Sequence, residues 1–229
     1  MVNNSINNSR VKIKVKKGSK SVSSRRWLER QLNDPYVLAA KEEGYRSRSA
    51  YKLIEINDKF KFLKNGSLVL DLGSAPGGWS QVAANIVGVP KRGKVVSVDI
   101  ENIIPIEGVS FIQGSIMDEN ILEIIKKELD DKVDIVLSDM APFASGHRST
   151  DQTRSLLLAE LAFDAAIKLL NKDGIFCCKL IRGKGEEELI KIMREYFFSI
   201  KRFKPESSRK NSAEIFIIGL YFNDKSWPN

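Results

Sequence analysis

The segment that most constrains the fold of this chain is LVLDLGSAPGGWSQ, residues 68–81. Its first five residues, Leu68–Leu72, are four apolar side chains and one acid, which is typical of a short buried strand. Residues 73–78 form a glycine-rich turn, and residues 79–87 have the composition of a helix. A strand, a glycine turn and a helix in this order form the first half of a nucleotide-binding α/β fold.

The turn differs from the dinucleotide-binding fingerprint, and this difference indicates which class of ligand it can bind. The fingerprint has glycine at its third position, where this chain has Ala75 followed by Pro76. The turn therefore lacks the usual pyrophosphate-binding loop. Glycines such as Gly73 let a ligand approach the backbone closely, and Asp71 is placed to lie near positive groups. A smaller, cationic nucleoside suits these features, and S-adenosyl-L-methionine (AdoMet) is the natural candidate.

The rest of the chain alternates short apolar strands with amphipathic helices. This alternation predicts one mostly parallel, seven-stranded sheet with helices on both faces. The last two strands are joined by a short polar loop, so they should be antiparallel, because a parallel crossover needs a dozen or more residues. Beyond the first strand, strands are predicted at residues 94–99, 109–113, 133–138, 174–178, 200–203 and 214–222, and longer helices at 116–130, 151–170 and 186–197.

The positive charge of the chain is concentrated at its start. The net charge is +8, and residues 1–30 hold nine Lys and Arg side chains but one acid, so the remaining residues are balanced. A neutral body with a cationic arm favours a polyanionic partner, most simply nucleic acid, over a solubilising tail. We expect residues 1–22 to form a flexible basic arm and residues 23–229 to form a single domain.

Composition narrows the protein class further. Cys177 and Cys178 are adjacent, which excludes a disulfide framework and favours a reducing compartment. With His147 as the single histidine, no zinc-type ligand spacing exists, so no metal is expected. No apolar run approaches the length of a membrane span, and no apolar signal core is present. We therefore expect a cytoplasmic monomer that has no contact with a membrane.

Charged side chains stand at one edge of the predicted sheet. In such sheets the ligand lies outside the carboxyl ends of the parallel strands. The residues at those ends are Asp71, Asp99, Asp139 and Lys179, with Glu214 at the start of the antiparallel strand. Lys52, on a helix ahead of the first strand, can cover the same edge. One strand-end lysine or acid is usually structural, but the convergence of four such side chains (Lys52, Asp139, Lys179 and Glu214) favours a site.

Two sets of residues resemble one enzyme family. The segment DLGSAPGGWSQ, residues 71–81, resembles the AdoMet-binding motif of the FtsJ/RrmJ family of RNA 2'-O-ribose methyltransferases. The contexts SAYKL, SDMAP, CKL and SAEI resemble the Lys-Asp-Lys-Glu tetrad of that family, at Lys52, Asp139, Lys179 and Glu214. The resemblance covers residues 27–222. It implies a Rossmann-like class I AdoMet-dependent methyltransferase fold, with cofactor contacts at Gly77, Trp79, Asp99 and Asp139.

The chemistry implied by this resemblance suits the tetrad. A ribose 2'-hydroxyl is a poor nucleophile until a base takes its proton while the methyl group is displaced in line. A lysine amine can be that base when burial or a neighbouring cation favours its neutral form. We expect Lys179 to be the base, with Asp139 and Lys52 assisting it and Glu214 in a more peripheral role.

One loop departs from the family pattern. The family has Gln-Gly-Asp after its third strand, where the acid contacts adenine, whereas this chain has Gln-Gly-Ser ending at Ser115. Ser115 can form a hydrogen bond but carries no charge, and Asp118 lies three residues further on. Either residue could take the place of the family's acid.

The substrate is also implied by the resemblance. Bacterial members of this size methylate a uridine ribose in the 23S ribosomal RNA of the large subunit, so ribosomal RNA is the expected partner. The basic arm, Arg46, Arg48 and residues 201–210 would contact its phosphates. Two alternatives stay open: a transfer RNA 2'-O-methyltransferase, and a non-catalytic RNA-binding factor of ribosome assembly. A carbon-5 methyltransferase is disfavoured because Cys177 and Cys178 lie in an apolar strand.

Overall fold

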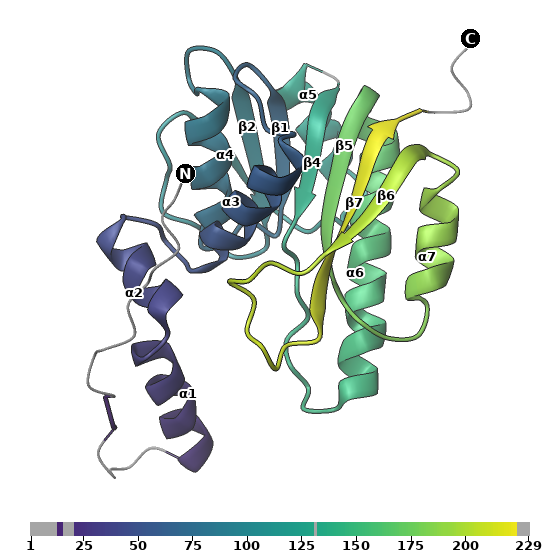
Figure 1. The fold of residues 1–229 in the computed structure, drawn as a ribbon. Helices are drawn as coiled ribbons and strands as arrows, with labels where there is room; N and C mark the ends of the chain where they lie inside the picture. The colour runs from purple at the N-terminus through teal and green to yellow at the C-terminus, as the bar shows by residue number, and fades with distance from the viewer. Residues whose placement is uncertain (1–12, 16–20, 131, 224–229) are drawn as a thin grey trace.

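The computed structural model describes residues 13–15, 21–130 and 132–223. These residues form one seven-stranded sheet with helices packed on both of its faces (Figure 1). The basic arm predicted over residues 1–22 lies mostly outside the described residues. Within the described ranges, no helix is long and apolar enough to cross a membrane.

The sheet has the strand order β3-β2-β1-β4-β5-β7-β6. Its first five strands are parallel to their neighbours, and β7 is antiparallel to both β5 and β6. This arrangement confirms the predicted mostly parallel sheet with an antiparallel last strand. The strands are β1 (Leu68–Leu72), β2 (Lys94–Asp99), β3 (Val109–Gln113), β4 (Val133–Ser138), β5 (Leu170–Ile181), β6 (Phe197–Phe203) and β7 (Glu214–Phe222).

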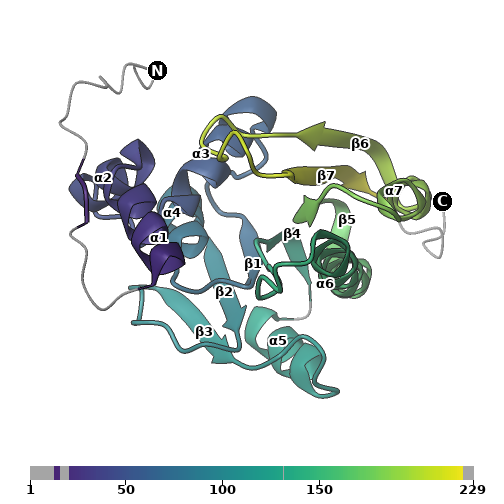
Figure 2. The ribbon, with the colours of Figure 1, turned by 90° about the horizontal axis from the view of Figure 1, so that it is seen from below.

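Two helical layers cover the sheet (Figure 2). Helices α3 and α4 pack on one face, where Cys177 and Phe216 are buried, and α5, α6 and α7 pack on the other, where Cys178 is buried. Alternation of side chains along a strand explains why adjacent cysteines enter different layers. The helices are α1 (Val22–Leu32), α2 (Pro35–Glu42), α3 (Ser49–Phe60), α4 (Gly78–Val87), α5 (Ile121–Leu129), α6 (Arg148–Leu169) and α7 (Glu186–Met193).

Some boundaries differ from those predicted. Helix α5 begins at Ile121 rather than at residue 116, because the N–H of Ser115 donates to the carboxylate of Asp118 and holds residues 115–118 in a turn. Helix α3 has no side-chain cap, and the hydroxyls of Ser47 and Ser49 at its start bond each other at 2.6 Å.

The strand order reverses its direction between β1 and β4. From β1 the chain proceeds outward to β2 and β3, whereas β4 and β5 extend the sheet on the other side. Loops that leave the carboxyl ends of β1 and β4 therefore diverge, which opens a crevice where ligands bind in folds of this type. The glycine turn follows β1 and Asp139 follows β4, so both sequence motifs lie at this crevice.

Candidate active site

The four tetrad side chains form two ion pairs. Nζ of Lys179 lies 2.7 Å from Oδ1 of Asp139 and also donates to the carbonyl oxygen of Asp139. Nζ of Lys52 lies 2.8 Å from Oε1 of Glu214. All four side chains are largely buried, between 10% and 16% exposed. The structure therefore brings together the four residues that the sequence placed at one edge of the sheet.

The register of β5 and β7 accounts for this convergence. Lys179 pairs with Phe216 and Ile181 pairs with Glu214 across the antiparallel ladder. Directly paired residues point to the same face, as do residues two apart on a strand. Lys179 and Glu214 therefore share one face, and Nζ of Lys52 lies 5.8 Å from the centre of the Phe216 ring above it.

Electrostatics tie the two ion pairs into one cluster. Burial favours the neutral form of Glu214, but the charge and hydrogen bond of Lys52, together with the charge of Lys179, outweigh it. The pKa of Glu214 is therefore lowered below its usual 4.5, and its carboxylate is ionised at neutral pH. The charge of Lys179 acts on Glu214, and this interaction links the two pairs. Among residues 21–130 and 132–223, no group of three His, Cys, Asp or Glu side chains could hold a metal ion.

The glycine turn is fixed from both sides. Gly73 has a φ of +73°, and a Cβ atom there would lie 2.5 Å from Cγ of Met140, so the turn packs directly on the segment after β4. On the other side, the Asp99 carboxylate accepts the N–H of Ala75 and the N–H of Glu101, each at 2.8 Å. Each carboxylate oxygen can accept more than one hydrogen bond, so Asp99 keeps capacity for a ligand.

Two residues predicted to bind a cofactor lie beneath the surface. Asp71 is 0% exposed and accepts the hydroxyl of Ser80 at 2.6 Å. Trp79 is 2% exposed, donates from Nε1 to the Ser49 carbonyl oxygen, and packs on Phe216 with ring centres 5.5 Å apart. Neither side chain offers surface for contact with a ligand. Both instead hold the turn in position, and Asp71 can act on a bound cation only through its charge.

The burial of Asp71 predicts an unusual dependence of stability on pH. Burial, reinforced by the charges of Asp139 and Asp99 against the Ser80 hydrogen bond, raises the pKa of Asp71 to about 7. In the unfolded chain this pKa is near 3.8. The folded state therefore holds the proton more tightly, and stability falls as pH rises between these two values, by at most about 1.4 kcal/mol per pH unit.

Replacing Asp71 with asparagine should remove this loss, because the amide oxygen can still accept the Ser80 hydroxyl. The free energy of unfolding, measured with urea across this pH window, should fall with pH more steeply in the wild type than in Asp71→Asn. Parallel pH profiles of the two proteins would contradict this account of Asp71.

Ser115 and Asp118 belong to one turn at the end of β3. Besides the bond from the Ser115 N–H to Asp118 at 3.0 Å, the hydroxyl of Ser115 accepts the N–H of Met117 at 3.2 Å. The turn thus presents a hydroxyl and a carboxylate side by side, rather than the single carboxylate of the family pattern.

The two arginines before α3 do not have the surroundings that the sequence suggested. Arg46 donates to three carbonyl oxygens, those of Pro76, Ile104 and Pro105, and so connects the glycine turn to the loop after β2. Arg48 pairs with Asp34 and donates to the carbonyl oxygen of Ser207. Both guanidinium groups have partners within the protein, and their contact with RNA phosphates stays a prediction. Charge pattern alone cannot reveal such carbonyl partners.

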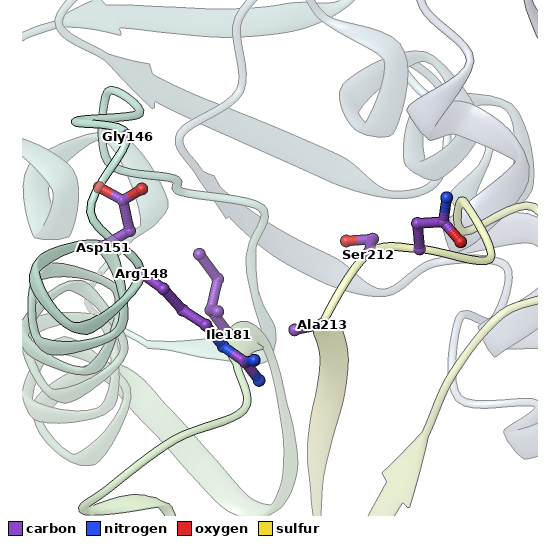
Figure 3. A pocket seen from close by; sticks show the side chains of 7 residues that line it. Gly146, Arg148, Asp151, Ile181, Ser212 and Ala213 are labelled. Atoms are coloured by element: carbon purple, nitrogen blue, oxygen red, sulfur yellow. The ribbon is translucent and has the colours of Figure 1, made fainter.

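A cavity of about 570 Å³ adjoins the tetrad. Figure 3 shows Gly146, Arg148 and Asp151 on one wall, Ser212 and Ala213 on the opposite wall, and Ile181 between them. Asn211 completes the lining. Sequence reasoning missed this cavity, because it is lined by the start of α6, the end of β5 and the loop before β7, whose approach to one another depends on the fold.

Comparisons with known proteins agree on one family. Residues 45–222 match the model of the FtsJ-like methyltransferase family. A Rickettsia akari protein named ribosomal RNA large subunit methyltransferase E is 47% identical over 92% of this chain and 93% of the relative. A Brucella ovis protein of the same name is 44% identical over 94% of this chain and 90% of the relative.

A solved structure is also similar. The crystal structure of a Plasmodium falciparum protein, named as a ribosomal RNA methyltransferase, matches with a TM-score of 0.69 and 32% identity. The match covers 78% of this chain and 98% of that one. These findings confirm the resemblance that the glycine turn and the four tetrad contexts indicated. The chain therefore belongs to the FtsJ-like methyltransferase family.

Proposed function

We propose that this protein transfers a methyl group from AdoMet to the ribose 2'-hydroxyl of a uridine in the 23S ribosomal RNA of the large ribosomal subunit. The observation that carries the proposal is the Lys179 amine, held by Asp139 at the crevice beside the Lys52–Glu214 pair. The names of the Rickettsia and Brucella relatives support the large-subunit substrate.

The residues around the glycine turn fit AdoMet, whose sulfonium supplies an electrophilic methyl group. The backbone of Gly73 and Gly77, both with positive φ, leaves room for close approach. Asp99 would accept the ribose hydroxyls, and the turn of Ser115 and Asp118 would receive the adenine amine. The N-terminus of α4, which begins at Gly78, favours a carboxylate.

The catalytic step proposed for the tetrad is a proton transfer. Nζ of Lys179 takes the proton of the 2'-hydroxyl, while the 2'-oxygen bonds the methyl carbon and the sulfur–methyl bond breaks. Lys179 becomes cationic during this step, and the Asp139 carboxylate at 2.7 Å stabilises that charge. The ion pair with Glu214 holds Lys52 in place in the same cluster.

Arg46 should support cofactor binding without taking part in the chemistry. Arg46→Ala removes the hydrogen bonds by which one guanidinium connects the Pro76 carbonyl oxygen to the loop at residues 104–105. One hydrogen bond to a charged group contributes about 1.5–3 kcal/mol, so we expect AdoMet to bind about tenfold more weakly. The rate at saturating AdoMet should change little.

Calorimetric titration of AdoMet into Arg46→Ala checks this expectation. Arg92→Ala is a matched control, since Arg92 bonds Asn65 elsewhere on the protein. Equal AdoMet affinity in the wild type and in Arg46→Ala would show that the turn does not depend on Arg46.

The substrate is tested by methyl transfer from labelled AdoMet to large ribosomal subunits and to transfer RNA, both prepared without their own modifications. Label in 23S RNA of the subunit supports the proposal. Label in transfer RNA alone would move the substrate to the alternative class. Protein that binds AdoMet and large subunits but transfers no methyl group would favour the non-catalytic assembly factor. The basic residues 1–22 are proposed to add affinity for phosphates.

A further inference from the structure

Among the described residues, Arg148 differs from Arg46, Arg48 and Arg202 in that its guanidinium has no partner within the protein. Arg46 and Arg48 are engaged by carbonyl oxygens and by Asp34, and Arg202 pairs with Glu186 at 2.9 Å. Within the described ranges, no hydrogen bond, ion pair or ring contact engages the Arg148 guanidinium, which lines the cavity described above. A cation left without a protein partner beside a catalytic cluster is available to an anionic group of the substrate.

The position of the cavity relative to the tetrad indicates which molecule enters it. Ile181 lies two residues beyond Lys179 on the same face of β5, and Ala213 directly precedes Glu214. In the strand order, the glycine turn follows β1, whereas Ala213 precedes β7, beyond the strand that carries Lys179. A cofactor on the turn and a ligand in the cavity would therefore lie on either side of the tetrad.

The lining of the cavity has the chemistry of a nucleotide site. Ile181 and Ala213 provide an apolar surface, Asn211 provides both a donor and an acceptor, and Arg148 provides a positive charge. One oxygen of the Asp151 carboxylate, Oδ1, accepts the N–H and the hydroxyl of Ser145, at 2.9 and 2.7 Å. The cavity volume of about 570 Å³ falls within the range of roughly 300–1,000 Å³ for small-molecule sites, which suits one unpaired nucleotide rather than a duplex.

We infer that this cavity, named here the Arg148 subsite, binds an unpaired nucleotide adjacent to the one that is methylated. Its base lies against Ile181 and Ala213 with its polar edge toward Asn211, and its phosphate lies at Arg148. Single-stranded RNA is generally recognised through bases turned out of the stack in this way. The inference rests on the proposed function for its RNA substrate. It adds the residues of the Arg148 subsite as those that recognise the nucleotide next to the methylated one.

The phosphate contact is tested with Arg148→Gln. The KM for large subunits should rise about tenfold, and the slope of log affinity against log salt should become shallower by about 1. The rate at saturating RNA and the AdoMet affinity should stay unchanged. Arg154→Gln is the matched control, because Arg154 is an exposed arginine of α6 that does not line the cavity. Equal KM values and salt slopes in the two variants would overturn the phosphate assignment.

Base reading is tested with Asn211→Ala on substrates that carry each of the four bases next to the target uridine. The wild type should prefer one base by about tenfold, because the Asn211 amide can both donate to and accept from one base edge, and Asn211→Ala should lose that preference. A preference that survives in Asn211→Ala would overturn the role of Asn211. Both residues are exposed, so the variants are expected to fold.

A binding assay separates this inference from the proposed function. Affinity for a short single-stranded oligoribonucleotide can be measured whether or not methyl transfer occurs. Weaker binding by Arg148→Gln than by Arg154→Gln supports the subsite even if the wild type methylates no ribosomal RNA. Equal binding by these two variants contradicts the subsite even if the wild type is fully active.

Discussion

Replacing Lys179 with methionine should lower the rate of methyl transfer by about 10²–10⁴-fold, the range that positioned proton transfer contributes, while AdoMet affinity stays nearly unchanged. Methionine keeps the length and volume of the side chain but has no amine to take the proton. Apart from Asp139, the proposed cofactor residues lie at the ends of β1, β2 and β3, away from β5, so their geometry should persist. The single-turnover rate and the AdoMet dissociation constant, measured on the same preparation, check both parts.

Lys201→Met is the matched control for this experiment. Lys201 is an exposed lysine on β6, and its replacement removes one positive charge without touching the tetrad. A Lys179→Met protein that is as active as Lys201→Met would remove lysine-base catalysis from the account.

Asp139→Asn should lower both the rate of methyl transfer and the affinity for AdoMet, because Asp139 pairs with Lys179 and also lies beside the glycine turn. The rate should fall by about 10²–10³-fold, as expected when a preorganised charge in the transition state is lost. AdoMet affinity should fall as well, since Asp139 follows β4 directly beside the glycine turn, where its backbone N–H donates to the Leu72 carbonyl oxygen. Lys179→Met, in contrast, should leave AdoMet affinity nearly intact.

Asp134→Asn controls for loss of stability in this comparison. Asp134 lies on the same strand near its other end, where its carboxylate accepts the N–H of Leu68 and the amide of Asn171. Its replacement should lower the melting temperature and leave the rate per folded molecule unchanged. If Asp139→Asn behaved like Asp134→Asn in both rate and cofactor affinity, Asp139 would have only a structural role.

Most of the fold could be predicted from the sequence, because the strands are short apolar runs bounded by glycine or by charged residues. The bounds of β1, β2, β3, β4 and β7 agree with the predicted ones. The exceptions have local causes that composition does not show. The side chain of Asp118 ends the turn before α5, and β5 extends to Ile181 because β7 pairs with it that far.

The sequence was sufficient to predict which residues lie together in the site. It was less informative about how these residues pair and pack. Strand ends in a parallel sheet converge, so Asp139 and Lys179 could be placed together from topology. The pairing of Lys52 with Glu214 depends on how α3 crosses the sheet, which the sequence does not encode in any local pattern. The same holds for Trp79, whose packing on Phe216 hides it from the crevice.

The proposed reaction places the methyl group on a ribose oxygen. The most direct measurement is to digest 23S RNA from large subunits methylated by this protein with labelled AdoMet, and to identify the labelled nucleoside by mass spectrometry. We predict label in 2'-O-methyluridine at one position, with the mass increase carried by the ribose fragment. Label carried by the base fragment, or by any nucleoside with an unmodified ribose, would contradict the account.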